Sequence, residues 1–186
     1  MATSALSVRL QAALRLLYHW KAVRPGSALL GVPTTELEEQ QLVERIITVV
    51  GEALILGPRG RVCIGLSPWG VSDTVAANAL YQQDSLPRLQ AEGFDKLRPG
   101  QGIYRVVTDK AGISHPLIGQ LTFRGYSRKR ILQVLKATEM DLTLQRARLI
   151  VLYPDAAPQV VHDRLRLIAA VPLWQTSYPR GSGPAS

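Results

Sequence analysis

The sequence predicts an α+β protein, in which N-terminal helices precede a mostly antiparallel sheet with a helix packed on one face. Apolar residues recur at helical spacing near the N-terminus, and short apolar runs bounded by Gly- and Pro-containing turns follow. With 186 residues, 46% hydrophobic and 19% charged, the chain is long and apolar enough to fold around its own core. We expect an N-terminal helix and arm over 1–34, an α+β domain over 35–178 and a C-terminal tail over 179–186.

The first expected element is a helix over Ala5–Val23. Ser4 is placed to cap it, and Pro25 and Gly26 end it. The apolar arm that follows is expected to pack on this subunit or on a neighbouring one. The residues predicted to form this interface arm are Leu29, Leu30 and Val32.

A second helix is expected over Thr35–Val50. Thr35 and Glu38 have the spacing of a capping box, in which each side chain satisfies a free backbone amide. The apolar residues predicted to form its buried stripe are Val43, Ile46, Ile47 and Val50.

The middle of the chain predicts a hairpin, two short helices and a second pair of strands. The hairpin joins Glu52–Leu56 to Arg61–Leu66 through a Gly-Pro turn, although a helix continuing to Leu56 is the alternative. The helices are expected over Thr74–Gln82 and Leu86–Ala91. An antiparallel pair is expected from Gly102–Thr108 and Leu117–Arg124.

The C-terminal third predicts a basic amphipathic helix and two strands. Ser127 caps a helix over Arg128–Thr138, and Leu142–Tyr153 reads as a long strand. The segment Val160–Val171 fits either a strand or a helix, and its alternation favours the strand.

The charge of the chain points to a polyanionic partner. Lys and Arg number 22 against 14 Asp and Glu, a formal net charge of +8. Such a field attracts nucleic acid, an anionic membrane or an acidic protein surface. The basic side chains could also serve solubility or assembly alone.

The last two predicted strands bring arginines together. If they form a hairpin centred on Ala156, Arg148 lies opposite Arg164 and Arg146 lies opposite Arg166. Like charges placed opposite each other repel, so this face is expected to bind an acidic partner or nucleic acid. The alternative is that these side chains are solvated or pair with the acidic segment 36–44.

No pattern of catalytic or metal-binding residues is found. The single cysteine, Cys63, excludes an intramolecular disulfide and a zinc site built from thiolates. The histidines His19, His115 and His162 do not have ligand spacing, and the glycine turns do not match phosphate-binding loops. We therefore expect no enzymatic activity and no cofactor. No uncharged apolar run reaches 18 residues, so no membrane span is expected.

The segment Gly125–Lys136 resembles the turn and recognition helix of helix-turn-helix DNA-binding proteins. A glycine turn there leads to a serine-capped helix with polar residues on its outer face. The resemblance implies that Ile131 and Leu135 hold the helix to its neighbour. It also implies that the residues facing DNA are Arg128, Lys129, Gln133 and Lys136.

The expected order of elements is helix, sheet, helix, long strand and final strand, which is similar to phage tail-completion and neck-connector proteins. This resemblance implies a ring of identical subunits that contacts other particle subunits or packaged DNA, in the virion or the cytoplasm. The leading hypothesis is therefore a non-enzymatic structural subunit of a large particle. The alternative is a basic nucleic-acid-binding protein.

Overall fold

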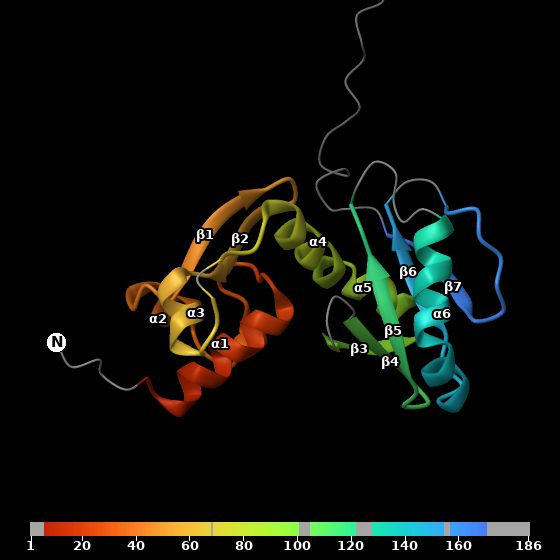
Figure 1. Ribbon diagram of the computed structural model, residues 1–186, viewed down its shortest axis with the longest axis horizontal. Coiled ribbons are helices and arrows are strands. Elements are labelled where there is room, and N and C mark those ends of the chain that lie inside the picture. The colour runs from red at the N-terminus through yellow and green to blue at the C-terminus, as the bar shows by residue number, and fades with distance from the viewer. Residues whose placement is uncertain (1–5, 68, 101–104, 122–127, 155–156, 171–186) are drawn as a thin grey trace, which may run out of the picture. The chain divides into compact units, whose positions relative to one another are not determined.

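The computed structural model describes residues 6–67, 69–100, 105–121, 128–154 and 157–170 (Figure 1). The chain forms two compact units: unit 1 comprises Met1–Leu80 and Pro99–Ile103, and unit 2 comprises Tyr81–Arg98 and Tyr104–Ser186. Helices and two separate sheets are present, so the α+β class is confirmed. The two units do not divide at the predicted boundary after residue 34, and the predicted tail over 179–186 lies outside the described residues.

Unit 1 begins with α1 (Val8–Trp20). The Ser7 hydroxyl accepts a hydrogen bond from the amide of Leu10 and caps the helix. The predicted cap, Ser4, lies outside the described residues. The predicted apolar face is confirmed, because the helix buries Leu10, Ala13, Leu14, Leu17 and Trp20.

The predicted helix over Thr35–Val50 is wrong beyond its first turns. After the short η1 (Ala28–Leu30), α2 covers only Thr34–Glu39, and β1 covers Val43–Thr48. The chain leaves the helix through Gln41, which has a φ of 56°. The apolar residues Val43, Ile46 and Ile47 fall at helical spacing and do not alternate along β1, so the pattern favoured a helix. The predicted capping box is absent, and the Thr34 hydroxyl instead accepts from the amide of Gly26 (2.9 Å).

The hairpin of unit 1 joins β1 to β2 (Gly51–Leu56), not β2 to the segment after it. Gly51 has a φ of 104°, a conformation that favours glycine directly after a tight turn. Arg61–Leu66 is not a strand. The helix α3 (Pro58–Cys63), with proline in its first turn, occupies the start of this segment. In α3, a Cβ on Gly60 would lie 2.0 Å from the carbonyl oxygen of Leu42, so the helix and this backbone meet without room for a side chain.

The remaining helices before the second sheet are α4 (Asp73–Asp84) and α5 (Leu86–Ala91), both close to their predicted ranges. Among the residues that the structure describes, no helix combines the length and the apolar character needed to cross a membrane.

Unit 2 is built on a five-stranded sheet in the order β3-β4-β5-β6-β7. Its strands are β3 (Phe94–Pro99), β4 (Arg105–Asp109), β5 (Ser114–Gly119), β6 (Leu149–Tyr153) and β7 (Leu165–Ala169). The β4–β5 pair is antiparallel, whereas β5–β6 and β6–β7 are parallel, so the sheet is mixed. Strand β3 was not predicted.

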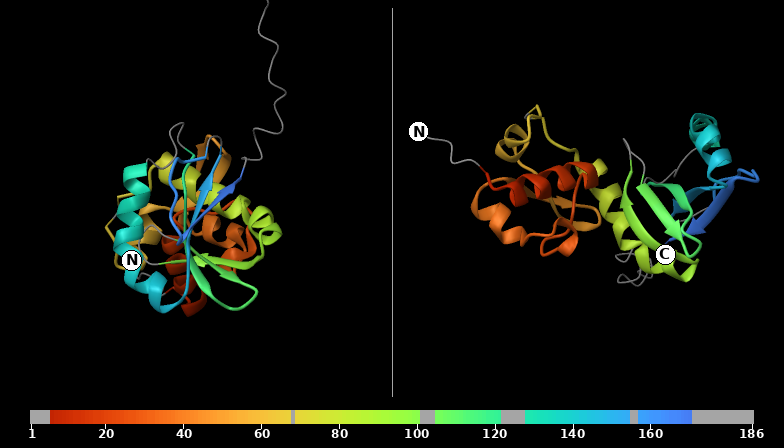
Figure 2. Two further views of the ribbon diagram at one scale, coloured as in Figure 1. Left: turned by 90° about the vertical axis from the view of Figure 1, so that its right-hand side faces the viewer. Right: turned by 90° about the horizontal axis from the view of Figure 1, so that it is seen from below.

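Helices cover both faces of this sheet (Figure 2). On one face, α6 (Arg128–Leu144) packs Ile131, Val134 and Leu135 against residues of β5 and β6. On the other face, Tyr81 of α4 and Leu89 of α5 pack on the alternate residues of the strands. A strand buried on both faces is almost uniformly apolar, which explains the composition of β6.

Two predictions for the C-terminal third need correction. The long strand Leu142–Tyr153 is wrong in its first half, because α6 continues to Leu144 and β6 starts at Leu149. The strand in Val160–Val171 is confirmed as β7, but it pairs with β6 in parallel, not as a hairpin. Alternating side chains look the same for both directions of pairing, so the pattern could not decide between them.

Candidate functional site

Most of the positive charge belongs to unit 2. This unit contains fifteen of the 22 Lys and Arg residues but eight of the 14 Asp and Glu residues, a formal charge of +7 out of the total of +8. Unit 1 is almost neutral by the same count. A polyanion would therefore be attracted mainly to unit 2.

The outer face of α6 carries part of this charge. The four predicted DNA-facing residues are all exposed, and the residues predicted to face inward are buried, so the orientation of the helix is confirmed. The exposed set consists of Arg128, Lys129, Gln133 and Lys136.

The helix-turn-helix interpretation does not fit the neighbouring structure. The described element before α6 is the strand β5, where that motif requires a first helix. The predicted turn at Gly125 and the cap Ser127 lie outside the described residues. In the fold, α6 is the crossover between the parallel strands β5 and β6.

Three arginines lie at one end of the sheet, and we call Arg146, Arg148 and Arg164 the basic edge. Arg146 follows α6 with a φ of 52°, Arg148 precedes β6, and Arg164 precedes β7. The amide of Leu149 donates to the carbonyl oxygen of Arg164 (2.8 Å), which brings the starts of the two parallel strands together. The predicted proximity of Arg148 and Arg164 is therefore present, although the pairing that suggested it is wrong.

The guanidinium groups of the basic edge are available for binding. Arg146 and Arg148 are exposed, and Arg164 is partly exposed. Within the described ranges, no carboxylate lies at ion-pair distance from any of the three. The guanidinium of Arg164 donates to the hydroxyl of Thr143 near the end of α6, a neutral partner that leaves its charge uncompensated.

Arg166 was predicted to join these arginines, and the structure separates it from them. In the parallel pairing, Arg166 lies beside Ile150 and not opposite Arg146. Its guanidinium donates to the carboxylate of Glu92 (2.7 Å) and to the carbonyl of Glu92 (3.1 Å), and it lies 5.2 Å from the centre of the Phe94 ring. Arg166 is therefore held by Glu92 and Phe94, on the face of the sheet that α4 and α5 cover.

Histidines that the sequence did not connect to the arginines hold the basic edge by its backbone. The amide of Arg148 donates to Nδ1 of His115 (3.0 Å), and the amide of Arg164 donates to Nδ1 of His162 (3.2 Å). His115 lies in β5 and is 7% exposed. Its contact with Arg148 joins residues 33 positions apart, so no local motif could have revealed it.

Asp109 fixes the other side of the His115 ring. Its Oδ2 lies 3.1 Å from Nε2 of His115, and its Oδ1 accepts from the amides of Ala111 and Ile113 (2.9 Å each). The hydrogen bond from His115, followed by those from the two amides, lowers the pKa of Asp109 below its usual range. The carboxylate is therefore an acceptor at neutral pH, and the His115 ring carries its hydrogen on Nε2.

The predicted interface arm packs mostly within unit 1. Leu30 and Val32 are buried, with 4% and 5% of their surface exposed, whereas Leu29 is 42% exposed. The hydroxyl of Ser27 accepts from the amide of Leu29 and caps η1. Of the three arm residues, only Leu29 presents a substantial surface to a partner.

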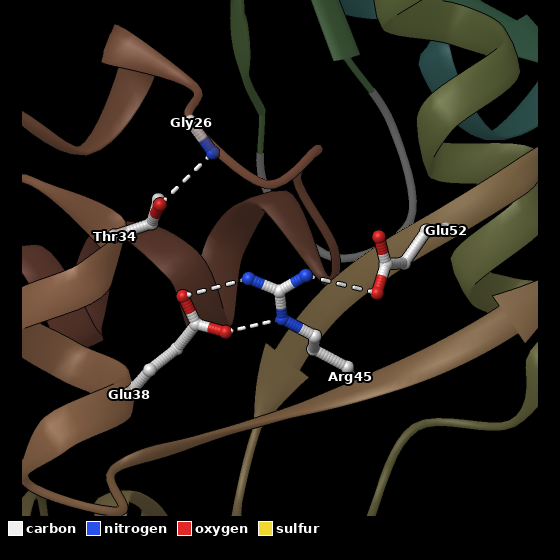
Figure 3. A network of polar contacts seen from close by, with 5 residues as sticks. All are labelled: Gly26, Thr34, Glu38, Arg45 and Glu52. Carbon is white, nitrogen blue, oxygen red and sulfur yellow. Dashed lines mark hydrogen bonds and ion pairs between the residues drawn. The ribbon is translucent and has the colours of Figure 1, made fainter.

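The other prominent charged group lies in unit 1 and is internally compensated. Figure 3 shows Arg45 of β1 between two carboxylates, donating to Glu38 of α2 and to Glu52 of β2 (3.1 Å for Glu52). The hydrogen bond from Arg45 lowers the pKa of Glu38. Because two acids neutralise one base, this cluster offers no excess positive charge to an anion.

Within the described part of the molecule, no group of three or more His, Cys, Asp or Glu side chains is placed to hold a metal ion. No protein family, curated protein or solved structure gives a match to this chain.

Proposed function

We propose that this chain is a non-enzymatic nucleic-acid-binding protein whose unit 2 contacts the phosphate backbone. The observation that supports this proposal is the basic edge, where three arginines lie at the start of two parallel strands and, among the residues that the structure describes, none has a carboxylate partner. Neighbouring guanidinium groups repel one another, and a bound phosphate removes that repulsion. Arginine suits this ligand because its planar fork donates two parallel hydrogen bonds to phosphate oxygens.

The expected binding is largely independent of base sequence. Arg146, Arg148 and Arg164 project from the end of a sheet and from the residues that flank it, not from a helix placed to enter a groove. Contacts of this kind fix the protein on the backbone but do not read base edges. The outer face of α6 adds Lys129 and Lys136 to the same unit, which extends the positive surface.

The test is a titration of the full chain against a labelled DNA duplex of about 20 base pairs, from about 50 to about 200 mM salt. The variant Arg148→Glu/Arg164→Glu should bind more weakly and should reduce the slope of log affinity against log salt by about two. The control is Arg9→Glu/Arg15→Glu, which makes the same change of charge at exposed positions of α1 in unit 1. Equal weakening by both variants would contradict a site at the basic edge.

A second candidate function is that of an assembly subunit in a large particle such as a phage tail or neck. Exposed apolar side chains favour it: Ile47 and Val49 at the tip of the β1–β2 hairpin are 75% and 72% exposed, and Met140 and Leu144 on α6 are 75% and 76% exposed. Exposed apolar groups of this kind are used to contact other proteins. Light scattering on the purified chain tests this candidate. A large assembly that dissociates in the variant Ile47→Ser/Val49→Ser would support it. A chain that stays monomeric at all concentrations would contradict it.

A further inference from the structure

The backbone of the basic edge depends on the protonation state of two imidazoles. The amides of Arg148 and Arg164 donate to Nδ1 of His115 and of His162, respectively. A ring nitrogen accepts a hydrogen bond only while it carries no proton, so both bonds require neutral histidines. Imidazoles ordinarily gain a proton between about pH 8 and pH 5.

The environment of His115 determines what protonation would change. Asp109 at the end of β4 already holds Nε2, so the added proton must go to Nδ1, against the amide of Arg148. The ring of Phe94 packs edge-on against His115, with the centroids 5.5 Å apart. Because Asp109 and Phe94 hold the ring in place, the start of β6 is the part that must move.

The elements packed near His115 carry cations, and one of these, Arg166, is paired with the carboxylate of Glu92. Arg166 of β7 lies on the Phe94 ring, Arg98 of β3 donates to the Ser114 hydroxyl beside His115 (3.0 Å), and Lys110 follows Asp109 in the β4–β5 turn. His162 is exposed in the segment before β7, with Asp163 and Arg164 as its neighbours in the chain.

We propose that His115 and His162 are positioning residues for the basic edge, and that nucleic-acid binding weakens on acidification because protonated imidazoles release the amides of Arg148 and Arg164. This inference rests on the proposed function and adds a pH response to the same site. The expected change in affinity is opposite to the one that net charge alone predicts. On acidification the three histidines gain positive charge, which by itself would strengthen binding to a polyanion.

The binding experiment uses the full chain and the same DNA duplex at constant ionic strength, between about pH 8 and pH 5.5. In His115→Asn/His162→Asn, the side-chain oxygen offers an acceptor in place of Nδ1 but cannot titrate. His19→Asn in α1 of unit 1 is the matched control. We expect the affinities of wild type and His19→Asn to fall by about fivefold on acidification, as for the loss of one hydrogen bond, and the affinity of the double variant not to fall. Wild-type binding that stays constant or strengthens at low pH would overturn the proposal, as would an equal fall in the double variant.

An NMR titration without nucleic acid separates this inference from the proposed function. The imidazole nitrogen signals should identify the Nε2-protonated form of His115 at high pH, and the amide proton signals of Arg148 and Arg164 should shift in step with the titration of the two rings. Amide signals that do not follow the imidazoles would refute the positioning role, even in a chain that binds DNA. A chain that does not bind DNA at pH 8, but whose Arg148 and Arg164 amide signals follow the imidazoles, would refute the proposed function and the pH effect on binding. The hydrogen bonds between the histidines and these amides would still be supported.

Discussion

The backbone amide of Arg148 lies 3.0 Å from Nδ1 of His115, a contact that ties the start of β6 to the second residue of β5. Parallel strands are joined along their length by slanted backbone hydrogen bonds. Here a side chain extends that connection beyond the last backbone pair, to the residue that carries the guanidinium. The charge of Arg148 is therefore presented from a fixed main chain and not from a free loop.

The first prediction separates the two kinds of arginine in unit 2. Arg148→Ala should weaken binding to DNA several-fold and leave thermal stability almost unchanged, because its side chain is exposed. Arg166→Ala should leave binding unchanged and destabilise the fold by about 1 kcal/mol, since it removes hydrogen bonds to Glu92 and a contact with Phe94. Anisotropy titrations and urea unfolding of both variants provide the comparison. A loss of stability in Arg148→Ala together with a loss of DNA binding in Arg166→Ala would contradict this prediction.

The second prediction concerns acid. Because the pKa of Asp109 is lowered in the folded chain, its contribution to stability is complete above about pH 5 and is lost as the pH falls through the folded pKa. The melting temperature of Asp109→Asn should therefore lie below that of the wild type at pH 5 and approach it as the pH falls through the folded pKa. Glu139→Gln on α6 controls for the loss of one negative charge. A difference between Asp109→Asn and wild type that does not change with pH would show that the carboxylate does not act through ionisation.

The third prediction tests the close approach in unit 1. Alanine is favoured over glycine in a helix by about 1 kcal/mol, but a Cβ at position 60 would lie 2.0 Å from the Leu42 carbonyl oxygen. We expect the clash to prevail, so that Gly60→Ala destabilises the fold by about 2–3 kcal/mol in urea unfolding. The control is Gly70→Ala, where no atom lies within 4 Å of the added Cβ. A Gly60→Ala variant as stable as its control would show that the backbone can separate there at little cost.

The fourth prediction concerns the core beneath the sheet of unit 2. The hydroxyl of Tyr81 is buried and donates to the carbonyl oxygen of Ala170 (2.8 Å). Tyr81→Phe keeps the ring and should destabilise the fold by about 1 kcal/mol, because the carbonyl loses its buried partner. Tyr18→Phe, on a partly exposed position of α1, should change stability by less than about 0.5 kcal/mol. Equal effects in thermal unfolding would argue against this hydrogen bond.

Sequence patterns predicted the elements whose signal is local. The apolar faces of α1 and α6 follow from helical spacing, and the basic residues of α6 are exposed as expected. The predicted helix over Thr35–Val50 failed because β1 is selected by its partner β2, an interaction that spacing within one segment does not encode.

The candidate site depends even more on distant contacts. Arg148 and Arg164 were expected to be neighbours because an antiparallel hairpin was assumed, but the strands pair in parallel. In this pairing Arg166 lies beside Ile150 and not beside the arginines of the basic edge. The link from Asp109 through His115 to Arg148 connects three strands of the sheet. Its members are separated by turns and by α6 in the sequence, so composition and motif spacing could not bring them together.

The concentration of positive charge in unit 2 has a kinetic consequence. A long polyanion exerts its pull over roughly 10 Å at physiological ionic strength, before any contact forms. Because the pull on unit 1 is nearly balanced, the chain should be turned during its approach so that most first collisions occur through unit 2. Productive encounters would then be more frequent than random tumbling allows, and this advantage should disappear in concentrated electrolyte.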